Sequence, residues 1–124
     1  MGVKDPAGLS VGSLRWLPML YELRQYRAQP GRREDLARCM EEVIIPFQAS
    51  KGMVIVASFV GEAEDDLYVW IRRFEDEAER ERLYKAVYED DRWKNEIAAA
   101  VGELLDRPRM LVTRLSPTPK SVLH

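Results

Sequence analysis

Hydrophobic and polar positions divide the chain into four strand-like segments and two helix-like regions. β-Branched runs and alternating polarity predict strands at about residues 19–27, 53–60, 67–74 and 110–115. Apolar residues recur at helical spacing from about residue 32 to residue 50, and again between residues 77 and 105. The second helical region is interrupted at Asp90-Asp91, which we interpret as a turn and a new helix N-cap. The predicted order is therefore β-α-β-β-α-β.

Turn-forming and capping residues support these boundaries. Pro30-Gly31 separates the first strand from the first helix, and Gly52 follows the end of that helix. Asp76 is expected to cap the next helix. Pro46 lies inside the first helical pattern, where its ring and missing N–H group disturb the hydrogen-bond ladder. It is therefore predicted to kink or end the helix near its C-terminal turn.

This order of elements predicts one architecture. Two right-handed β-α-β crossovers interleaved in one sheet produce four antiparallel strands with the helices on one face. The expected fold class is α+β of the ferredoxin-like type, with the first and third strands at the centre of the sheet. The other face is left bare, and a soluble monomer rarely exposes so large an apolar surface. We therefore expect a homodimer in which two sheets face each other and enclose a lumen.

The two central strands carry different side chains on their two faces, because side chains alternate along a strand. One set is aliphatic and is expected to pack against the apolar helix residues: Leu23, Leu67, Val69 and Ile71. The alternate positions are charged or aromatic, and parity places them on the opposite face, lining the lumen: Glu22, Arg24, Tyr26, Tyr68, Trp70 and Arg72.

Length and composition limit the number of domains and the partners. The 124 residues suffice for one domain, which we place at residues 19–116. A Gly-, Ser- and Pro-rich lead-in at residues 1–18 is expected to be flexible, and residues 117–124 are expected to form an extended tail. The net charge of −2 attracts neither nucleic acid nor an anionic membrane, and no apolar run approaches the roughly 20 residues that span a bilayer. The only cysteine, Cys39, excludes an internal disulfide and fits a cytoplasmic protein.

Three sequence motifs resemble signatures of the NIPSNAP family. They are LYELRQY at residues 20–26 followed by QPG at 29–31, LYVWIRRF at 67–74, and DDRW at 90–93. The resemblance covers about residues 19–116 and implies a dimeric α/β barrel, which agrees with the architecture expected from the pattern. It implies as more distant relatives cofactor-free monooxygenases, lactone isomerases, polyketide cyclases and haem-binding enzymes. The NIPSNAP branch itself implies no single chemistry.

Candidate catalytic residues come from the charged positions of the central strands. Glu22 is a candidate base, and Arg24 and Arg72 are candidates for holding an enolate or a carboxylate. Tyr26 or Tyr68 is a candidate proton donor.

Candidate substrate contacts are aromatic: Tyr68, Trp70 and Trp93. Trp70 would stack on a flat ligand. We expect no haem, because the only histidine is His124 in the tail, and no metal site, because the acidic pairs lack His or Cys partners. We expect no other cofactor, since no Gly-rich phosphate loop is present.

Each candidate also has a structural interpretation. Glu22 could form salt bridges with Arg24 or Arg72 that satisfy buried charges and fix the dimer. A carboxylate beside two guanidinium groups should stay ionised, which makes it a weak base and favours ligand binding over proton abstraction. Trp93 begins the last helical stripe and is alternatively a core residue. Cys39 is interpreted as a structural residue, because no histidine is available to activate it.

Two classes of function therefore remain open. In the first, the protein is a small enzyme without a cofactor that isomerises, cyclises or oxygenates a flat, partly oxygenated hydrophobic or aromatic molecule. In the second, it is a non-catalytic dimer that binds a ligand or scaffolds a partner.

Overall fold

Four antiparallel strands form a single sheet in the order β2-β3-β1-β4. The computed structural model describes residues 19–124, so the expected lead-in at residues 1–18 lies outside the described part. The strands are β1 (Leu20–Arg27), β2 (Val54–Val60), β3 (Leu67–Phe74) and β4 (Leu111–Leu115). All four predicted strands are confirmed to within a residue or two, and β1 and β3 lie at the centre of the sheet as predicted.

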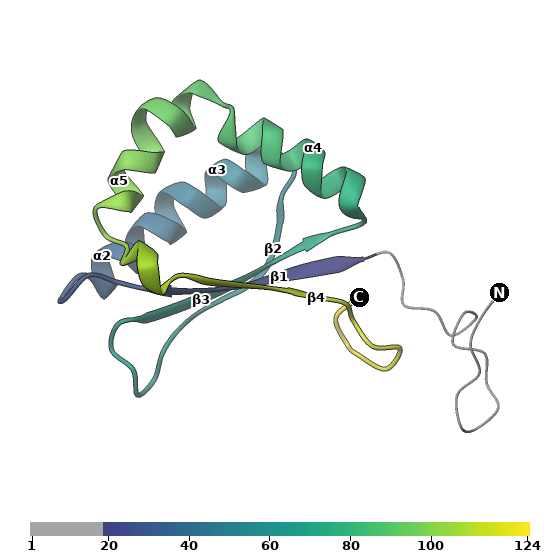
Figure 1. The fold of residues 1–124 in the computed structure, drawn as a ribbon, viewed down its shortest axis with the longest axis horizontal. Coiled ribbons are helices and arrows are strands. Elements are labelled where there is room, and N and C mark those ends of the chain that lie inside the picture. The colour runs from purple at the N-terminus through teal and green to yellow at the C-terminus, as the bar shows by residue number, and fades with distance from the viewer. Residues whose placement is uncertain (1–18) are drawn as a thin grey trace.

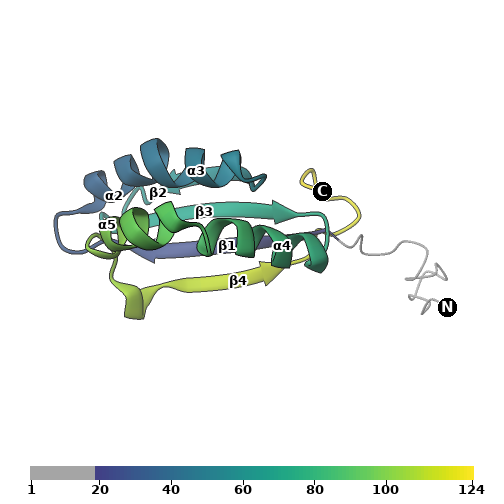
Figure 2. The same ribbon diagram turned by 90° about the horizontal axis from the view of Figure 1, so that it is seen from above.

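The helices form one layer on one face of this sheet (Figures 1 and 2). The first helical region comprises α2 (Arg33–Cys39), a π-helical segment η1 (Met40–Ile44) and α3 (Ile45–Ser50). The second comprises α4 (Glu77–Tyr88), a π-helical segment η2 (Trp93–Ile97), α5 (Ala98–Gly102) and the short 3-10 turn η3 (Arg107–Arg109). The α+β ferredoxin-like fold class is confirmed. No helix in the described part of the chain is long and apolar enough to cross a membrane.

The two helical regions begin and bend for identifiable local reasons. Asp76 caps α4 as predicted, since its side chain accepts a hydrogen bond from the N–H of Glu79 at 2.7 Å. The prediction for Pro46 is only partly right, because the helical path continues past it to Ser50. Pro46 sits in the first turn of α3, and the wide turn of η1 comes directly before it. A widened turn accommodates the proline without ending the helix.

Pairing of the two central strands brings the candidate residues into register. Glu22 lies opposite Arg72 across the β1–β3 ladder, and Arg24 lies opposite Trp70. Tyr26 continues the same face, opposite Tyr68. Because directly opposite residues point to the same face of an antiparallel sheet, all the candidate side chains of β1 and β3 gather on one side.

That side is the one covered by the helices, so the predicted orientation of the central strands is wrong. The charged and aromatic set points into the space between sheet and helices rather than into a lumen on the open face: Glu22, Arg24, Tyr26, Tyr68, Trp70 and Arg72. The aliphatic set lies on the open face instead: Leu23, Leu67, Val69 and Ile71.

The helix layer explains the reversal. Glu22 and Arg72 are both 0% exposed although they are charged. The prediction considered only the apolar residues of the helices, but α3 and α4 also present polar side chains. Gln48, Tyr84 and Tyr88 hydrogen-bond Arg72. A buried charge is tolerated where such partners surround it, so the charged face can meet the helices.

The open face of the sheet is largely aliphatic. Phe59 of β2, which pairs with Val69, is 56% exposed, and Leu111 and Leu115 of β4 are also exposed. The segment after β4 does not extend away from the domain but turns back under one end of this face, opposite the helices (Figure 1). There it lies close to Tyr21.

The orientation of the sheet can be tested with two phenylalanines. Phe74→Ala should reduce the free energy of unfolding by about 3–5 kcal/mol, because Phe74 is 0% exposed under the helices. Phe59→Ala on the open face should cost less than about 1 kcal/mol in dilute protein. Urea denaturation followed by far-UV circular dichroism measures both. The reverse order of the two costs would contradict this orientation.

Candidate functional site

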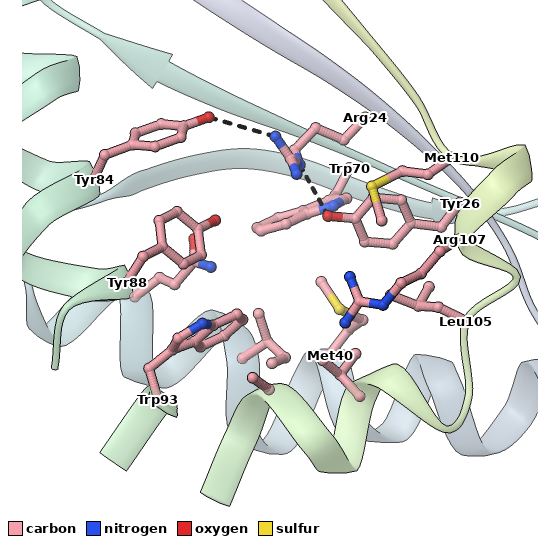
Figure 3. A pocket seen from close by; sticks show the side chains of 14 residues that line it. Arg24, Tyr26, Met40, Trp70, Tyr84, Tyr88, Trp93, Leu105, Arg107 and Met110 are labelled. Carbon is pink, nitrogen blue, oxygen red and sulfur yellow. Dashed lines mark hydrogen bonds between the residues drawn. The ribbon is translucent and has the colours of Figure 1, made fainter. Parts of the chain in front are cut away.

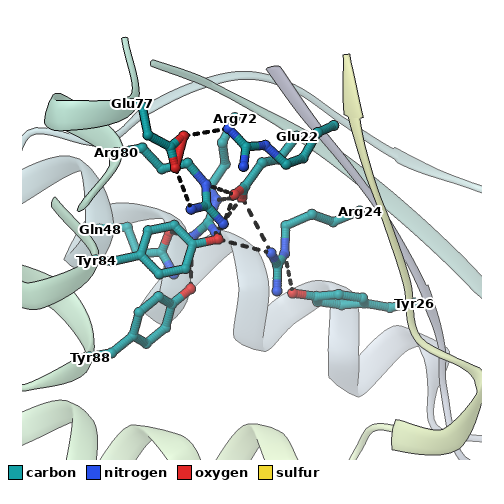
Figure 4. Close-up of polar contacts among 10 residues, drawn as sticks. Glu22, Arg24, Tyr26, Gln48, Arg72, Glu77, Arg80, Tyr84 and Tyr88 are labelled. Carbon is teal, nitrogen blue, oxygen red and sulfur yellow. Dashed lines mark hydrogen bonds and ion pairs between the residues drawn. The ribbon is translucent and has the colours of Figure 1, made fainter. Parts of the chain in front are cut away.

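A buried carboxylate lies at the centre of a polar network between the sheet and the helices. One oxygen of Glu22, Oε1, accepts hydrogen bonds from Nη2 of Arg72 at 2.6 Å, from Nε of Arg72 at 3.1 Å and from Nη1 of Arg24 at 3.3 Å (Figure 4). The other oxygen, Oε2, accepts from Nε of Arg80 at 2.6 Å and from the hydroxyl of Tyr84 at 2.5 Å. We call these residues, with Gln48 and Tyr88, the Glu22 network.

The surroundings keep Glu22 ionised. Burial alone would raise the pKa of this carboxyl, but the charge of Arg72 and the hydrogen bonds from Tyr84, Arg72 and Arg80 lower it from 4.5 to about 2. Both oxygens are already occupied by donors. A carboxylate with this pKa and these partners is a poor proton acceptor, so the geometry disfavours the candidate role of Glu22 as a base.

Arg72 is held entirely by protein groups. Its Nε and Nη2 donate to Glu22, and Nη2 also donates to the Tyr84 hydroxyl at 2.8 Å. Its Nη1 donates to Oε1 of Gln48 at 2.8 Å and to the Tyr88 hydroxyl at 2.7 Å. With every nitrogen engaged and no exposed surface, Arg72 is suited to organise the network and not to bind a ligand. The salt-bridge interpretation therefore fits Glu22 and Arg72 best.

Arg24 differs from Arg72 because one of its guanidinium nitrogens makes no hydrogen bond to the described residues. Its Nε donates to the Tyr26 hydroxyl at 2.9 Å, and its Nη1 makes long contacts to Glu22 and to Tyr84 at 3.3 and 3.5 Å. Its Nη2 has no acceptor among residues 19–124. The guanidinium also lies 5.8 Å from the ring centre of Trp70. Arg24 is thus held in place while part of its guanidinium remains available.

Arg24 forms one wall of a pocket of about 340 Å³ between the sheet and the helices (Figure 3). Aromatic side chains from four elements, β1, β3, α4 and η2, line it: Tyr26, Trp70, Tyr84, Tyr88 and Trp93. Aliphatic residues of the helical layer and of the η3–β4 junction complete the apolar surface: Met40, Ile44, Val101, Leu105 and Met110. Arg107 also lines the pocket, below Tyr26 and beside Leu105 in this view. The volume and the mixture of apolar walls with few polar groups are typical of a small-molecule site.

The two π-helical segments both contribute to this pocket. Met40 and Ile44 come from η1, and Trp93 comes from η2. Widened turns of this kind occur frequently at functional sites, because they change the direction of side chains along a helix. The widened turn before Pro46 and the one that begins at Trp93 therefore help to shape the pocket walls.

The structure brings most of the predicted site residues together. Arg24, Tyr26, Trp70 and Trp93 all line the pocket. Trp93 packs edge-to-face on Tyr88 with ring centres 4.9 Å apart. It is therefore both a pocket residue and part of the aromatic packing, as its two interpretations allowed.

The candidate Tyr68 does not line the pocket, and neither does Cys39, which was predicted to be structural. Tyr68 belongs to the hydrophobic core, and burial raises the pKa of its hydroxyl to about 12, so it is a weak proton donor. Cys39 is half-buried, and burial raises the pKa of its thiol. A thiol with a raised pKa is less nucleophilic, in line with a structural role.

Sequence analysis missed several residues of the site. Gln48, Tyr84, Tyr88 and Arg107 all line the pocket, but none was a candidate. Arg80, Tyr84 and Tyr88 follow one another at intervals of four, which places them on one face of α4. This polar and aromatic stripe was the available signal, because a helix facing an ordinary core would carry aliphatic residues there.

Comparisons with known proteins agree with this fold. The family profile of NIPSNAP matches residues 21–121. The chain belongs to the NIPSNAP family. No curated protein matches it significantly.

Solved structures of the NIPSNAP family are similar throughout the domain. A NIPSNAP family protein from Agrobacterium tumefaciens, described as having unknown function, is 22% identical with a TM-score of 0.78, covering 89% of this chain and 97% of that one. A NIPSNAP-like domain protein from Burkholderia xenovorans is also 22% identical, with a TM-score of 0.75 and coverage of 85% and 90%. These likenesses concern the fold alone.

Removal of the central carboxylate tests the Glu22 network. Glu22→Gln should reduce the free energy of unfolding near neutral pH by about 3–5 kcal/mol, the range for losing one partner of a buried ion pair. The folded-state pKa lies below the unfolded value, so the contribution of Glu22 is present above pH 4.5 and is lost as the pH falls toward about 2. Urea titrations of wild type and variant at pH 7, 4 and 3 measure this difference.

A surface glutamate provides the control. Glu64 is 57% exposed and pairs with Arg27, so Glu64→Gln should change stability by less than about 1 kcal/mol at any of these pH values. If wild type and Glu22→Gln lost stability in parallel between pH 4.5 and 2, Glu22 would not be the titrating group inferred here.

Proposed function

We propose that this NIPSNAP protein binds a flat, partly oxygenated hydrophobic or aromatic small molecule in the pocket between its sheet and its helices, and acts on it without a cofactor. The observation that carries the proposal is a pocket of about 340 Å³ with aromatic walls and a guanidinium nitrogen, Nη2 of Arg24, that has no acceptor among residues 19–124. An unpaired buried donor costs free energy unless a ligand or water satisfies it.

The arginines and tyrosines of the pocket suit chemistry at an oxygen of the ligand. The Tyr26 hydroxyl accepts from Arg24, and the Tyr88 hydroxyl accepts from Arg72. Neither hydroxyl proton has an acceptor among the described residues, so each can be donated to a ligand oxygen. Arg24 can stabilise negative charge that develops on that oxygen. Enolisation passes through such an oxyanion, and so do the cyclisations and oxygenations that start from an enolate or a phenolate.

The described lining of the pocket contains no carboxylate and no imidazole. A substrate that loses its proton readily, such as a phenol or a β-dicarbonyl compound, suits this site better than one that needs a strong protein base. This restricts the proposed isomerase, cyclase or monooxygenase reactions to acidic substrates.

The alternative function is a non-catalytic dimer that binds a ligand or scaffolds a partner. The aliphatic open face of the sheet favours dimerisation whichever alternative holds, because a second sheet would cover Phe59, Leu111 and Leu115. A bound compound recovered unchanged after incubation with the protein in air would support the alternative, whereas a change in its mass would support an enzyme. With one cysteine in the chain, we place this activity in the reducing cytoplasm.

Filling the pocket tests the binding site. Ala98 lines the pocket, whereas its neighbour Ala99 is exposed on the same helix. Ala98→Phe should weaken binding of 2-naphthol, a flat and partly oxygenated probe, by at least about tenfold, or some 1.4 kcal/mol. Ala99→Phe should leave the affinity unchanged. Isothermal titration calorimetry measures both, and equal affinities for the two variants would place the probe elsewhere.

An acidic residue on the open face tests the dimer. Phe59→Asp should shift the protein toward monomer in sedimentation velocity at micromolar concentration, because a charge would face the apolar surface of the second sheet. Ala99→Asp, on the exposed side of α5, is the matched control and should leave the sedimentation coefficient unchanged. A wild-type protein that sediments as a monomer would overturn dimerisation through this face.

A further inference from the structure

The charged side chains that line the pocket are all positive. Arg24 and Arg107 line it, whereas no Asp or Glu of the described chain does. Arg107 also has no carboxylate partner among residues 19–124. The other residues that line the pocket are neutral, so the two arginines make its electrostatic potential positive.

The network behind the pocket does not neutralise this charge. Glu22 is shared by Arg72, Arg80 and Arg24, at distances of 2.6, 2.6 and 3.3 Å. Glu77 is also near Arg80, but it is 45% exposed and pairs as well with Arg114. Arg24 has the longest of the three contacts to Glu22, so it is the member of this group whose charge is least compensated.

The neutral polar groups around Arg24 are oriented as donors. Arg72 can only donate, so its bond to Gln48 fixes Oε1 of that amide toward Arg72 and leaves the amide nitrogen for the pocket. Nη2 of Arg24 is a second such donor, since it has no acceptor among residues 19–124. A ligand at this end of the pocket must therefore supply acceptors.

We infer that the pocket recognises an aromatic carboxylate, with the carboxylate against Arg24 and the ring against the aromatic wall that Tyr88 and Trp93 form together. This inference rests on the proposed function and specifies its ligand class. A carboxylate is acceptor-only and planar, so it matches a partly occupied guanidinium better than a hydroxyl or an amide does. Arg107 adds a second positive charge to the pocket lining, below Tyr26 in Figure 3.

The test compares two probes of the same shape, 2-naphthoate and 2-naphthamide, by isothermal titration calorimetry on the full chain. The wild-type protein should bind the carboxylate at least about tenfold more tightly than the amide. Arg24→Gln should reduce this preference to less than about threefold, and Arg24→Lys should keep part of it because the charge remains. Arg38→Gln removes an exposed arginine of α2 that pairs with Asp35, so it should leave the preference unchanged.

The possible results distinguish a failure of the carboxylate inference from a failure of the proposed function. If the wild type binds both probes equally, the carboxylate assignment is wrong while the pocket and the proposed function stand. If folded Arg24→Gln keeps the full preference, the carboxylate is bound elsewhere and the inference fails. If neither probe binds, the proposed function fails with it. Circular dichroism and the melting temperature of Arg24→Gln show whether the variant is folded, and Arg24→Lys provides the comparison if it is not.

Discussion

The pairing of Glu22 with Arg72 is the interaction on which the arrangement of sheet and helices depends. The two residues lie opposite each other on β1 and β3, and both are fully buried. Charges removed from water cost several kcal/mol each unless they are paired and hydrogen-bonded. The partners come from α3 through Gln48 and from α4 through Tyr84, so both helical regions must pack at defined positions over the sheet. A one-residue slip of β3 would turn Arg72 to the open face and leave Glu22 without its main partner.

This network also explains why neighbouring positions on the same strand face serve different purposes. Arg72 is surrounded by acceptors and has no capacity left for a ligand. Arg24 lies two residues from Glu22 on β1, at the edge of the network. Its side chain is 13% exposed, and one of its nitrogens has no acceptor in the described part of the chain. The network thereby restricts the movement of Arg24 without using all of the hydrogen-bond donors of its guanidinium group. A preorganised group of this kind loses little conformational entropy when a ligand binds.

The fold could be predicted from the sequence because its signals are local. Strand alternation, the N-cap at Asp76 and the turn residues each act over a few positions, and together they determine the order and the topology of the elements. Which face of the two central strands packs against the helices could not be predicted in the same way. Alternation divides Glu22 and Leu23 between two faces, but the choice of face depends on partners distant in sequence, such as Gln48 and Tyr84. The sequence pattern therefore placed Glu22, Arg24, Tyr26, Tyr68, Trp70 and Arg72 correctly on one common face, but assigned that face to the wrong side of the sheet.

The reversed orientation separates the proposed ligand site from the proposed dimer interface. If the aliphatic face of β1 and β3 had packed against the helices, the ligand site and the dimer interface would both have been on the other face of the sheet. Each residue of that face would then have contacted the partner subunit as well as the ligand. Instead, alternate residues of β1 and β3 serve opposite sides, with Trp70 in the pocket and Val69 beside the exposed Phe59. Substitutions on the open face can therefore alter association while the pocket keeps its side chains. The backbone of two central strands remains common to both sides, so a dimer that flattened or twisted the sheet would move Arg24 and Trp70 together relative to the helices.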